Sequence, residues 1–308
     1  MRVRTLAARG RNGPLRRPLA LVTFPAAPRA HDTLLWGRAH VPACCRYSMP
    51  KVYSSGRRLS TRRAGYNLAA MGAPIHLQPT APLAQRVLLP GDPGRALLLA
   101  QSLLDAPKMF NHNRGLWGYS GTAADGEPLT IQSTGMGGPS AAIVISELAD
   151  LGATTMLRTG TCGALQSDLE LGQLIVATEA IGDDGTSRAL GVNDRVPASP
   201  ALLEALVAAT GAPQGPVVST DLFYDDPREP EAGWIAAGAL AVEMESSTLF
   251  ALGARRGFEA GTVLVVSDLL TGERVRIGAE ELQAAEHRLG EAALLGLTML
   301  AGAAGATQ

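Results

Sequence analysis

The chain has few aromatic residues and little charge for its length. Phe, Trp and Tyr make up only 4% of its 308 residues, and Asp, Glu, Lys and Arg together make up 18%. Because Ala, Gly and Leu dominate instead, the core must come from many small aliphatic contacts rather than from a few rings. No run of eighteen or more apolar residues occurs, so we expect no membrane-spanning helix.

Cysteine is equally scarce. The three cysteines are Cys44, Cys45 and Cys162. A sparse and odd set is typical of a reducing compartment, and none of the spacings matches a metal-ligand pattern. We therefore expect a cytoplasmic protein without a metal site.

Acidic residues are almost missing from the first seventy positions. This segment holds thirteen Arg and one Lys against the single acid Asp32, a net charge of +13, whereas the whole chain has a formal net charge of -1. Such asymmetry indicates a tail attached to a separate folded body. The tail could be a basic arm for a polyanion, a transit peptide, or translated upstream sequence before a true start at Met71 or Met49. We favour the last, because no nucleic-acid-binding module follows, and we predict a basic extension over 1–70, disordered or non-native, and a catalytic domain over 71–308.

From Met71 onward, strand-like and helix-like segments alternate. This alternation predicts a single α/β domain with a mixed, mostly parallel central sheet flanked by helices. The expected strands cover 86–89, 116–123, 128–134, 154–159, 173–180, 214–219, 240–244 and 261–268. The expected helices cover 94–104, 137–151, 199–210, 245–256 and 278–302.

Asp268 ends the continuous apolar run 261–268, which has the β-branched composition of a buried parallel strand. Open α/β sheets bind their ligands at the carboxyl ends of such strands. A buried acid in that position can hold a proton near neutral pH and act as a general acid. The alternative is a helix N-cap, because Ser and Asp both cap well.

Two Gly-rich segments follow strands, 91–95 and 160–164, and each has an arginine beside it. Gly-rich turns let backbone N–H groups approach an anion, and guanidinium groups bind phosphate in a bidentate manner. Arg95 and Arg158 are therefore candidate anion ligands, and Arg114, in Asn113-Arg114-Gly115, is a third. Most arginines are surface residues, so each signal is weak when taken alone.

Two further segments indicate a binding pocket. Gly135-Met136-Gly137-Gly138 exposes its backbone through glycine, although a tight turn with a methionine in the core would look the same. In Glu243-Met244-Glu245, two acids follow a short apolar strand. They could favour the start of a helix, or one carboxylate could accept both vicinal hydroxyls of a sugar.

Taken together, the motifs resemble those of the hexameric-type bacterial nucleoside phosphorylases, a family that also includes uridine phosphorylases and related nucleosidases. The resemblance covers residues 74–302 and rests on ordered motifs. These are Leu89-Pro90-Gly91-Asp92-Pro93-Gly94-Arg95, Arg114-Gly115-Leu116-Trp117-Gly118-Tyr119, Thr134-Gly135-Met136-Gly137, Arg158-Thr159-Gly160-Thr161-Cys162-Gly163, Asp221-Leu222-Phe223-Tyr224, Val242-Glu243-Met244-Glu245 and Val266-Ser267-Asp268.

The resemblance implies that a nucleoside and phosphate are converted to a free base and ribose 1-phosphate. It implies a homo-oligomer with shared sites, a hexamer, that needs inorganic phosphate as co-substrate but no metal or organic cofactor. Roles carry over residue by residue. Phosphate would be bound by Gly91, Arg95, Arg158, Thr161 and a neighbouring subunit's Arg114. Ribose would be bound by Met136, Met244, Glu245 and His76, the last also reaching across the interface. The base would contact Phe223, Val242, Glu243 and Ser267, and Asp268 would protonate it.

One departure from the family pattern concerns the acid. The family's purine enzymes often carry an arginine beyond the serine-aspartate pair that assists the acid, but an ungapped count places Glu281 there. Arg274 or Arg276 could take its place if the loop is rearranged.

Three alternatives compete with a purine nucleoside phosphorylase. A uridine phosphorylase is disfavoured because no Gln follows Tyr224 to bind a pyrimidine, although segment 184–187 is similar to uridine enzymes. A hydrolytic nucleosidase would not need three arginines near the nucleophile. A nucleoside sensor with a basic nucleic-acid-binding arm would have no need to keep the acid and the arginines. We therefore expect purine nucleosides and phosphate as substrates, and neither membrane nor nucleic acid as a partner.

Overall fold

The computed structural model describes residues 73–224 and 229–305. The prediction for 1–70 lies outside these residues. The helices are α1 (Pro93–Leu103), α2 (Gly138–Asp150), α3 (Gly185–Ala189), α4 (Pro200–Thr210), α5 (Glu229–Ala236), α6 (Ser246–Arg256) and α7 (Ala279–Gly305), with a 3-10 turn at Asn113–Gly115. The strands are β1 (Arg86–Leu89), β2 (Leu104–Asn111), β3 (Gly118–Ala123), β4 (Pro128–Gln132), β5 (Thr155–Ala164), β6 (Leu174–Asp183), β7 (Arg195–Pro197), β8 (Gln214–Thr220), β9 (Ala241–Glu243), β10 (Glu259–Leu269) and β11 (Val275–Arg276).

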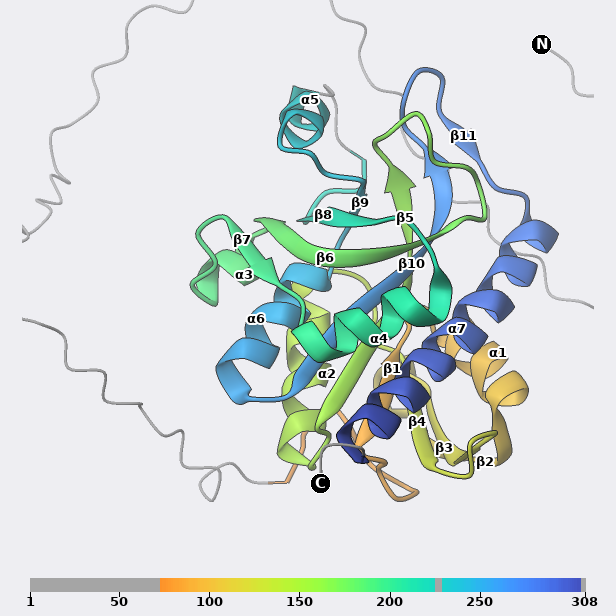
Figure 1. Cartoon of the computed structure of the whole chain (residues 1–308). Coiled ribbons are helices and arrows are strands. Elements are labelled where there is room, and N and C mark those ends of the chain that lie inside the picture. The colour runs from red at the N-terminus through yellow and green to blue at the C-terminus, as the bar shows by residue number, and fades with distance from the viewer. Residues whose placement is uncertain (1–72, 225–228, 306–308) are drawn as a thin grey trace, which may run out of the picture. The chain divides into compact units, whose positions relative to one another are not determined.

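The strands form one large sheet that closes on itself in part (Figure 1). β10 pairs with both β5 and β6, β6 pairs with β8, β8 with β9, and β9 returns to β5. These five strands therefore form a closed ring, and β1, β4, β3 and β2 extend from β5 in that order. Closure leaves the ring strands without a free edge, which is one way that sheets avoid exposed backbone groups.

The predicted α/β class is confirmed, with a mixed sheet between helices. Among the described residues, five strand pairings are parallel and six are antiparallel. The parallel share is smaller than the sequence predicts because the short strands β7, β9 and β11 each make an antiparallel pairing.

Helices cover the sheet on both sides, which explains the continuous apolar runs. Along β10, Val263 and Val265 pack in one hydrophobic cluster, whereas Leu264 and Val266 pack in another. The first cluster includes buried side chains of α1, α4 and α7, and the second includes those of α2 and α6. Successive side chains of a strand point to opposite faces, so a strand that is buried on both faces has no polar alternation.

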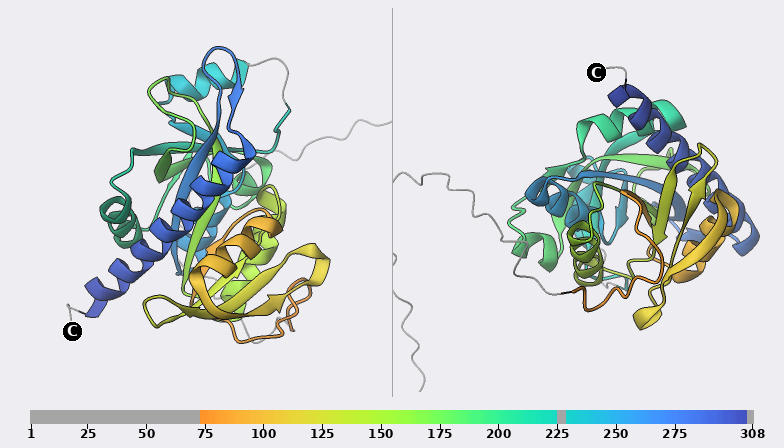
Figure 2. Two further views of the ribbon diagram at one scale, coloured as in Figure 1. Left: turned by 90° about the vertical axis from the view of Figure 1, so that its right-hand side faces the viewer. Right: turned by 90° about the horizontal axis from the view of Figure 1, so that it is seen from below.

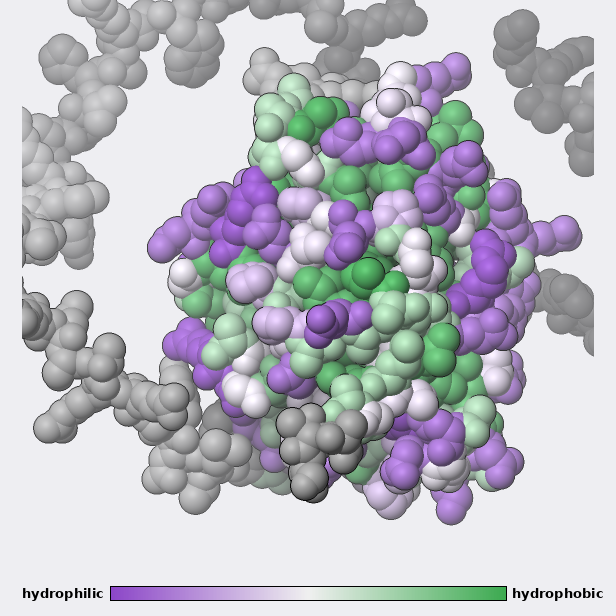
Figure 3. Space-filling view, viewed as in Figure 1, coloured by the Kyte–Doolittle hydropathy of each residue, from purple (hydrophilic) through white to green (hydrophobic). Residues whose placement is uncertain are grey.

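Helix α7 runs diagonally across the molecule beside α4 and α1 (Figures 1 and 2). At the upper end in Figure 1, α5 and β11 extend beyond the body of the sheet. On the face that α4 and α7 present, hydrophilic residues alternate with small hydrophobic areas (Figure 3). None of the helices in 73–224 and 229–305 has the length and hydropathy needed to cross a membrane.

Candidate active site

A pocket of about 720 Å³ opens at the end of the ring that α5 and β11 border. Twelve of the fourteen candidate residues from the sequence line it, although they come from distant segments. They are Gly91, Arg95, Met136, Arg158, Thr161, Phe223, Val242, Glu243, Met244, Glu245, Ser267 and Asp268.

Arg95 enters the pocket from the first turn of α1. Asp92 caps this helix, accepting hydrogen bonds from the N–H groups of Gly94 (3.0 Å) and Arg95 (3.1 Å). The Arg95 side chain is buried, and its Nε donates to Oε1 of Glu286 on α7 at 2.7 Å. Nε is thereby committed to Glu286, so the Nη end of the guanidinium is the part that can bind a ligand.

Arg158, in the middle of β5, is held by two carboxylates. Its Nε donates to Oε2 of Glu243 at 2.7 Å, and its Nη2 lies 2.6 Å from Oε2 of Glu245. Burial alone would lower the pKa of Arg158, but the carboxylates of Glu245 and Glu243 outweigh it and raise the pKa above its usual value. The remaining nitrogen, Nη1, would lie about 4.0 Å from a Cβ atom added to Gly91. The third nitrogen of Arg158 therefore faces the Gly91 turn.

Segment 160–164 is not the turn that the sequence predicts. These residues continue β5. All five residues pair with β10, but only Gly163 and Ala164 also pair with β9. Thr161 thus contributes to the pocket wall from a strand rather than from a turn. Gly160 serves a different purpose, since a Cβ there would lie 2.7 Å from the guanidinium carbon of Arg158. The glycine makes room for the arginine.

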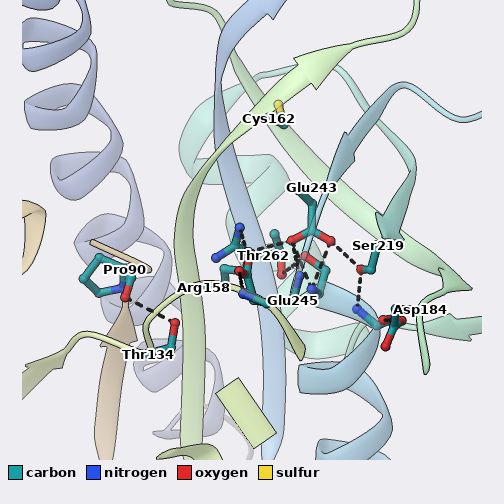
Figure 4. Close-up of polar contacts among 12 residues, drawn as sticks. Pro90, Thr134, Arg158, Cys162, Asp184, Ser219, Glu243, Glu245 and Thr262 are labelled. Carbon is teal, nitrogen blue, oxygen red and sulfur yellow. Dashed lines mark hydrogen bonds and ion pairs between the residues drawn. The ribbon is translucent and has the colours of Figure 1, made fainter. Parts of the chain in front are cut away.

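Glu243 does not have the contacts expected of a base-binding residue. Its side chain is fully buried, and both oxygens accept hydrogen bonds from the protein. Oε1 accepts from the Ser219 hydroxyl and from the Ser246 N–H at 3.0 Å. Oε2 accepts from Arg158, from the Ser246 N–H at 3.0 Å, and from the Glu245 N–H at 3.0 Å. Figure 4 shows this carboxylate at the centre of a polar cluster. Its acceptor capacity is used within the protein.

Glu245 lies between Gly137, in the segment before α2, and Arg158 on β5. Its Oε1 accepts from the Gly137 N–H at 2.6 Å, and Oε2 contacts Arg158. Burial raises the pKa of the Glu245 carboxyl group above its usual value, with Arg158 opposing the shift and Glu243 adding to it. The side chain is therefore fixed beside Met136 and Met244, which line the same pocket.

Asp268 lies within β10 and so does not cap a helix. The pairing between β10 and β5 shifts at Ser267, so Asp268 takes the position opposite Gly163 that a regular strand would give to residue 267. Such bulges redirect side chains beside active sites. Asp268 is buried, and its Oδ2 accepts from the Ser267 hydroxyl at 2.8 Å.

Arg274 contacts this acid, whereas Glu281, which the ungapped count places at the family arginine's position, does not line the pocket. Its Nη2 and Nε donate to Oδ1 of Asp268 at 3.1 and 3.3 Å. Arg276, on β11, is farther from the same oxygen at 4.0 Å. Glu281 is exposed in the first turn of α7.

Aromatic side chains form the outer part of the pocket. The Arg274 guanidinium lies over the Phe223 ring at 5.2 Å, and Phe223 contacts Tyr224 edge to face at 5.0 Å. Trp234 on α5 also lines the pocket, and it donates its Nε1–H to Asp183 at 2.9 Å. Val242 lines the same pocket. The outer part of the pocket is thus suited to a flat ring, which rings and guanidinium planes can stack against.

His76 and Arg114 lie outside the pocket of their own chain, and they lie near each other. The Asn113 side chain donates to the His76 carbonyl at 2.9 Å, and His76 Nδ1 lies 2.7 Å from Glu147. Although burial opposes it, hydrogen bonds from the His76 ring and from nearby backbone N–H groups lower the pKa of Glu147. Arg114 is exposed and has a left-handed backbone, with φ at 58°.

Sequence reasoning missed several residues around the pocket. Trp234 and Glu286 lie on helices whose sequence carries no sign of a site, so only the fold brings them there. Ser219 and Thr220 end strand β8, and this position alone could have marked them. The Cys162 thiol also lines the pocket, but burial raises its pKa, so it is a neutral group at physiological pH.

Two buried arginines at the inner end of one pocket, and a buried acid with aromatic walls at the outer end, define an enzyme that brings an oxyanion to a ring-bearing substrate. The chain belongs to the phosphorylase superfamily, whose family model matches residues 85–301.

Individual relatives agree with this family. A protein named guanosine phosphorylase from Halorubrum lacusprofundi is 42% identical over 194 residues, which cover 61% of this chain and 80% of the relative. A purine nucleoside phosphorylase DeoD-type from Geobacillus kaustophilus is 38% identical over 224 residues, covering 70% of this chain and 93% of the relative. Another of that name, from Caldanaerobacter subterraneus subsp. tengcongensis, is 39% identical over 210 residues, covering 65% and 89%.

Proposed function

We propose that the protein catalyses the reversible phosphorolysis of purine ribonucleosides and deoxyribonucleosides to a free purine and ribose or deoxyribose 1-phosphate. The convergence of Arg95 and Arg158 on one pocket with Asp268 carries this proposal. The names of the relatives support it, because each of them is called a purine nucleoside or guanosine phosphorylase. The reaction would belong to purine salvage, in the cytoplasm.

Phosphate binds between the Nη groups of Arg95 and Arg158, beside Gly91 and Thr161. One phosphate oxygen forms a bond to C1′ of the sugar as the bond from C1′ to N9 of the purine breaks. The bond-breaking electrons go to the base, and Asp268 donates its proton to N7 of the purine. General acid help of this kind accelerates a reaction by about 10²–10⁴-fold, and the arginines position the anion and stabilise its charge.

The sugar lies against Met136 and Met244, and Glu245 accepts hydrogen bonds from its hydroxyls. A carboxylate is suited to this because it offers only acceptors. The purine lies toward Phe223 and Val242, where the wall is apolar. Ser267 acts through its hydrogen bond to Asp268 rather than on the base directly.

The charge around the phosphate position favours help from a second copy of the chain. Arg95 and Arg158 contribute two positive charges, whereas their partners Glu243, Glu245 and Glu286 contribute three negative charges. Within the described residues, these five side chains together carry a net charge of -1. A phosphate dianion would be repelled by this sum, so a further cation stabilises its binding.

We assign that cation to the partner subunit's Arg114. Arg114 is exposed on its own chain, and the apolar residues Trp117 and Ile75, which follow Arg114 and precede His76, are 40% and 72% exposed. Non-glycine residues with positive φ are uncommon and concentrate at functional sites. We further propose that the partner subunit's His76 reaches the sugar, and that the assembly is a homohexamer with paired sites.

An assay over a panel of nucleosides, with and without phosphate, tests the reaction. We expect release of purine base and sugar 1-phosphate only when phosphate is present, and little activity on uridine. Base release without phosphate would identify a nucleosidase, and a preference for uridine would identify a uridine phosphorylase. Either result refutes the proposal.

Mixing two inactive variants tests the shared site. Arg114→Ala lacks the contributed cation, and Arg158→Ala lacks the resident one, so each alone should be nearly inactive. After the two are unfolded and refolded together, a mixed pair has one site with both arginines intact. We expect about a quarter of the wild-type activity to return, because half of the random pairs are mixed and one site in each works. No recovery, with mixed oligomers verified by mass, would refute shared sites.

A further inference from the structure

We propose that Ser219 and Glu243 form a positioning pair that sets the orientation of Arg158 for the anion. This inference rests on the proposed function insofar as the anion is phosphate. Figure 4 shows the chain of contacts, in which Ser219 reaches Glu243, and Glu243 reaches Arg158. Neither Ser219 nor Glu243 needs to touch the substrate for this role.

The direction of the Ser219 hydroxyl is determined by its surroundings. The backbone N–H of Ser247 donates to Ser219 Oγ at 2.9 Å, so the hydroxyl oxygen acts there as an acceptor. The hydroxyl proton then points to Oε1 of Glu243. β8 and β9 pair in register, with Ser219 opposite Glu243, so the fold itself brings the two side chains together. Ser247 is held in turn, since its own hydroxyl donates to the buried Asp184 at 2.7 Å.

Glu243, held by Ser219, in turn positions the Arg158 side chain and the backbone of Glu245. Its Oε2 accepts from Nε of Arg158 at 2.7 Å and from the backbone N–H of Glu245 at 3.0 Å. The first contact sets the plane of the guanidinium, and the second sets the start of α6, from which Glu245 reaches Nη2 of Arg158. With five hydrogen bonds from the protein, Glu243 has no acceptor left for a ligand.

The positioning role and a purely electrostatic role of Glu243 predict opposite changes in phosphate binding when Glu243 is replaced. A buried negative charge beside the site repels phosphate, so its removal alone would tighten phosphate binding. If Glu243 acts by orienting Arg158, its removal weakens phosphate binding instead, because a misplaced guanidinium no longer directs Nη1 toward the anion. The sign of the change in Glu243→Gln therefore distinguishes the two roles.

Ser219→Ala is the sharper variant, because it leaves the charge of Glu243 in place. Ser246→Ala is its matched control: both serines are fully buried, and both variants lose one hydroxyl. The Ser246 hydroxyl contacts Thr262 at 3.2 Å, and its backbone N–H to Glu243 survives the substitution. The two variants thus differ in whether the lost hydroxyl touches Glu243. Ser219→Ala also removes the acceptor of the Ser247 N–H, which is part of the same positioning contact.

The experiment measures inorganic phosphate binding by calorimetry on the full-length oligomer, together with KM for phosphate, KM for nucleoside and kcat. We expect Ser219→Ala to raise the Kd and KM for phosphate about 5- to 10-fold, the size of one ordinary intramolecular hydrogen bond. Glu243→Gln should raise them by more than tenfold. The KM for nucleoside should change less than the KM for phosphate in Ser219→Ala, and Ser246→Ala should match the wild type.

Two results overturn the inference: equal phosphate affinity in Ser219→Ala and Ser246→Ala, or tighter phosphate binding in Glu243→Gln. If circular dichroism shows that Glu243→Gln is not folded, the comparison of phosphate affinity between Ser219→Ala and Ser246→Ala still tests the inference. A wild-type protein that binds phosphate but cleaves no nucleoside would refute the proposed reaction, while the comparison of dissociation constants would still test the role of Ser219.

Discussion

Substituting Asp268 with Asn tests the proton donor most directly. Asn is nearly the same size, and its amide can still hydrogen bond to Ser267 and Arg274, but it cannot act as an acid. Because Asp268 is buried, a water molecule cannot easily take its place as the proton donor. We expect kcat on guanosine or inosine to fall by about 10²–10⁴-fold, which corresponds to about 2.7–5.5 kcal/mol of transition-state stabilisation.

The same variant should retain most of its activity on 7-methylguanosine. That nucleoside already carries a positive charge at N7, so the base leaves as a neutral molecule without receiving a proton. The test compares the loss of steady-state rate on guanosine or inosine with the loss on 7-methylguanosine, both measured at saturating phosphate. Asp184→Asn is a suitable control, since Asp184 is also a buried aspartate but does not line the pocket; it should lower both rates alike. Equal losses on the two nucleosides in Asp268→Asn would show that Asp268 is not the proton donor.

Three more changes test the surroundings of the site. Arg274→Gln should lower kcat/KM about fivefold, since the Arg274 side chain is 38% exposed and its ion pair with Asp268 is worth about 1 kcal/mol after solvent screening. Glu286→Gln loosens Arg95 and should change KM for phosphate more than KM for nucleoside, whereas Glu291→Gln, exposed on the same helix, should change neither. Asp125→Asn should destabilise the fold by roughly 1–2 kcal/mol at neutral pH, because it breaks a partly buried ion pair with Arg86. The Arg86 hydrogen bond lowers the pKa of Asp125 in the folded state, so this stabilisation is present above the unfolded pKa of about 3.9 and is lost as the pH falls below it. Urea unfolding at several pH values should therefore show the wild type and Asp125→Asn converging only in acid.

The sequence predicted the parts of the fold whose signal is local. Long apolar runs such as β10 were located because burial on both faces leaves a continuous pattern. β2 was missed because most of its side chains are exposed, it contains Pro107, and its pairing with β3 is interrupted by bulges, all of which are typical of an edge strand. The two residues of β11 are too few for any periodicity.

The sequence was less informative about contacts that depend on strand register. It placed Glu243 at the base, but register with β8 turns its carboxylate toward Ser219 and Arg158. It read 160–164 as a turn, because glycine is common in turns, whereas Gly160 is required by the nearby guanidinium. Whether Arg274 or Arg276 approaches Asp268 depends on the loop between β10 and β11, which residue counting cannot supply.

The closed ring of β5, β10, β6, β8 and β9 has a practical consequence for redesign. The residues to which we assign the anion and the sugar lie on β5 of the ring or in the segments that lead into α1, α2 and α6. The outer wall is different, since Trp234 lies on α5, outside the ring, and contacts it through a hydrogen bond to Asp183 and apolar packing against Leu165 and Val218. Libraries that vary α5 and the residues around Phe223 could therefore change which heterocycle is accepted while the inner chemistry stays intact.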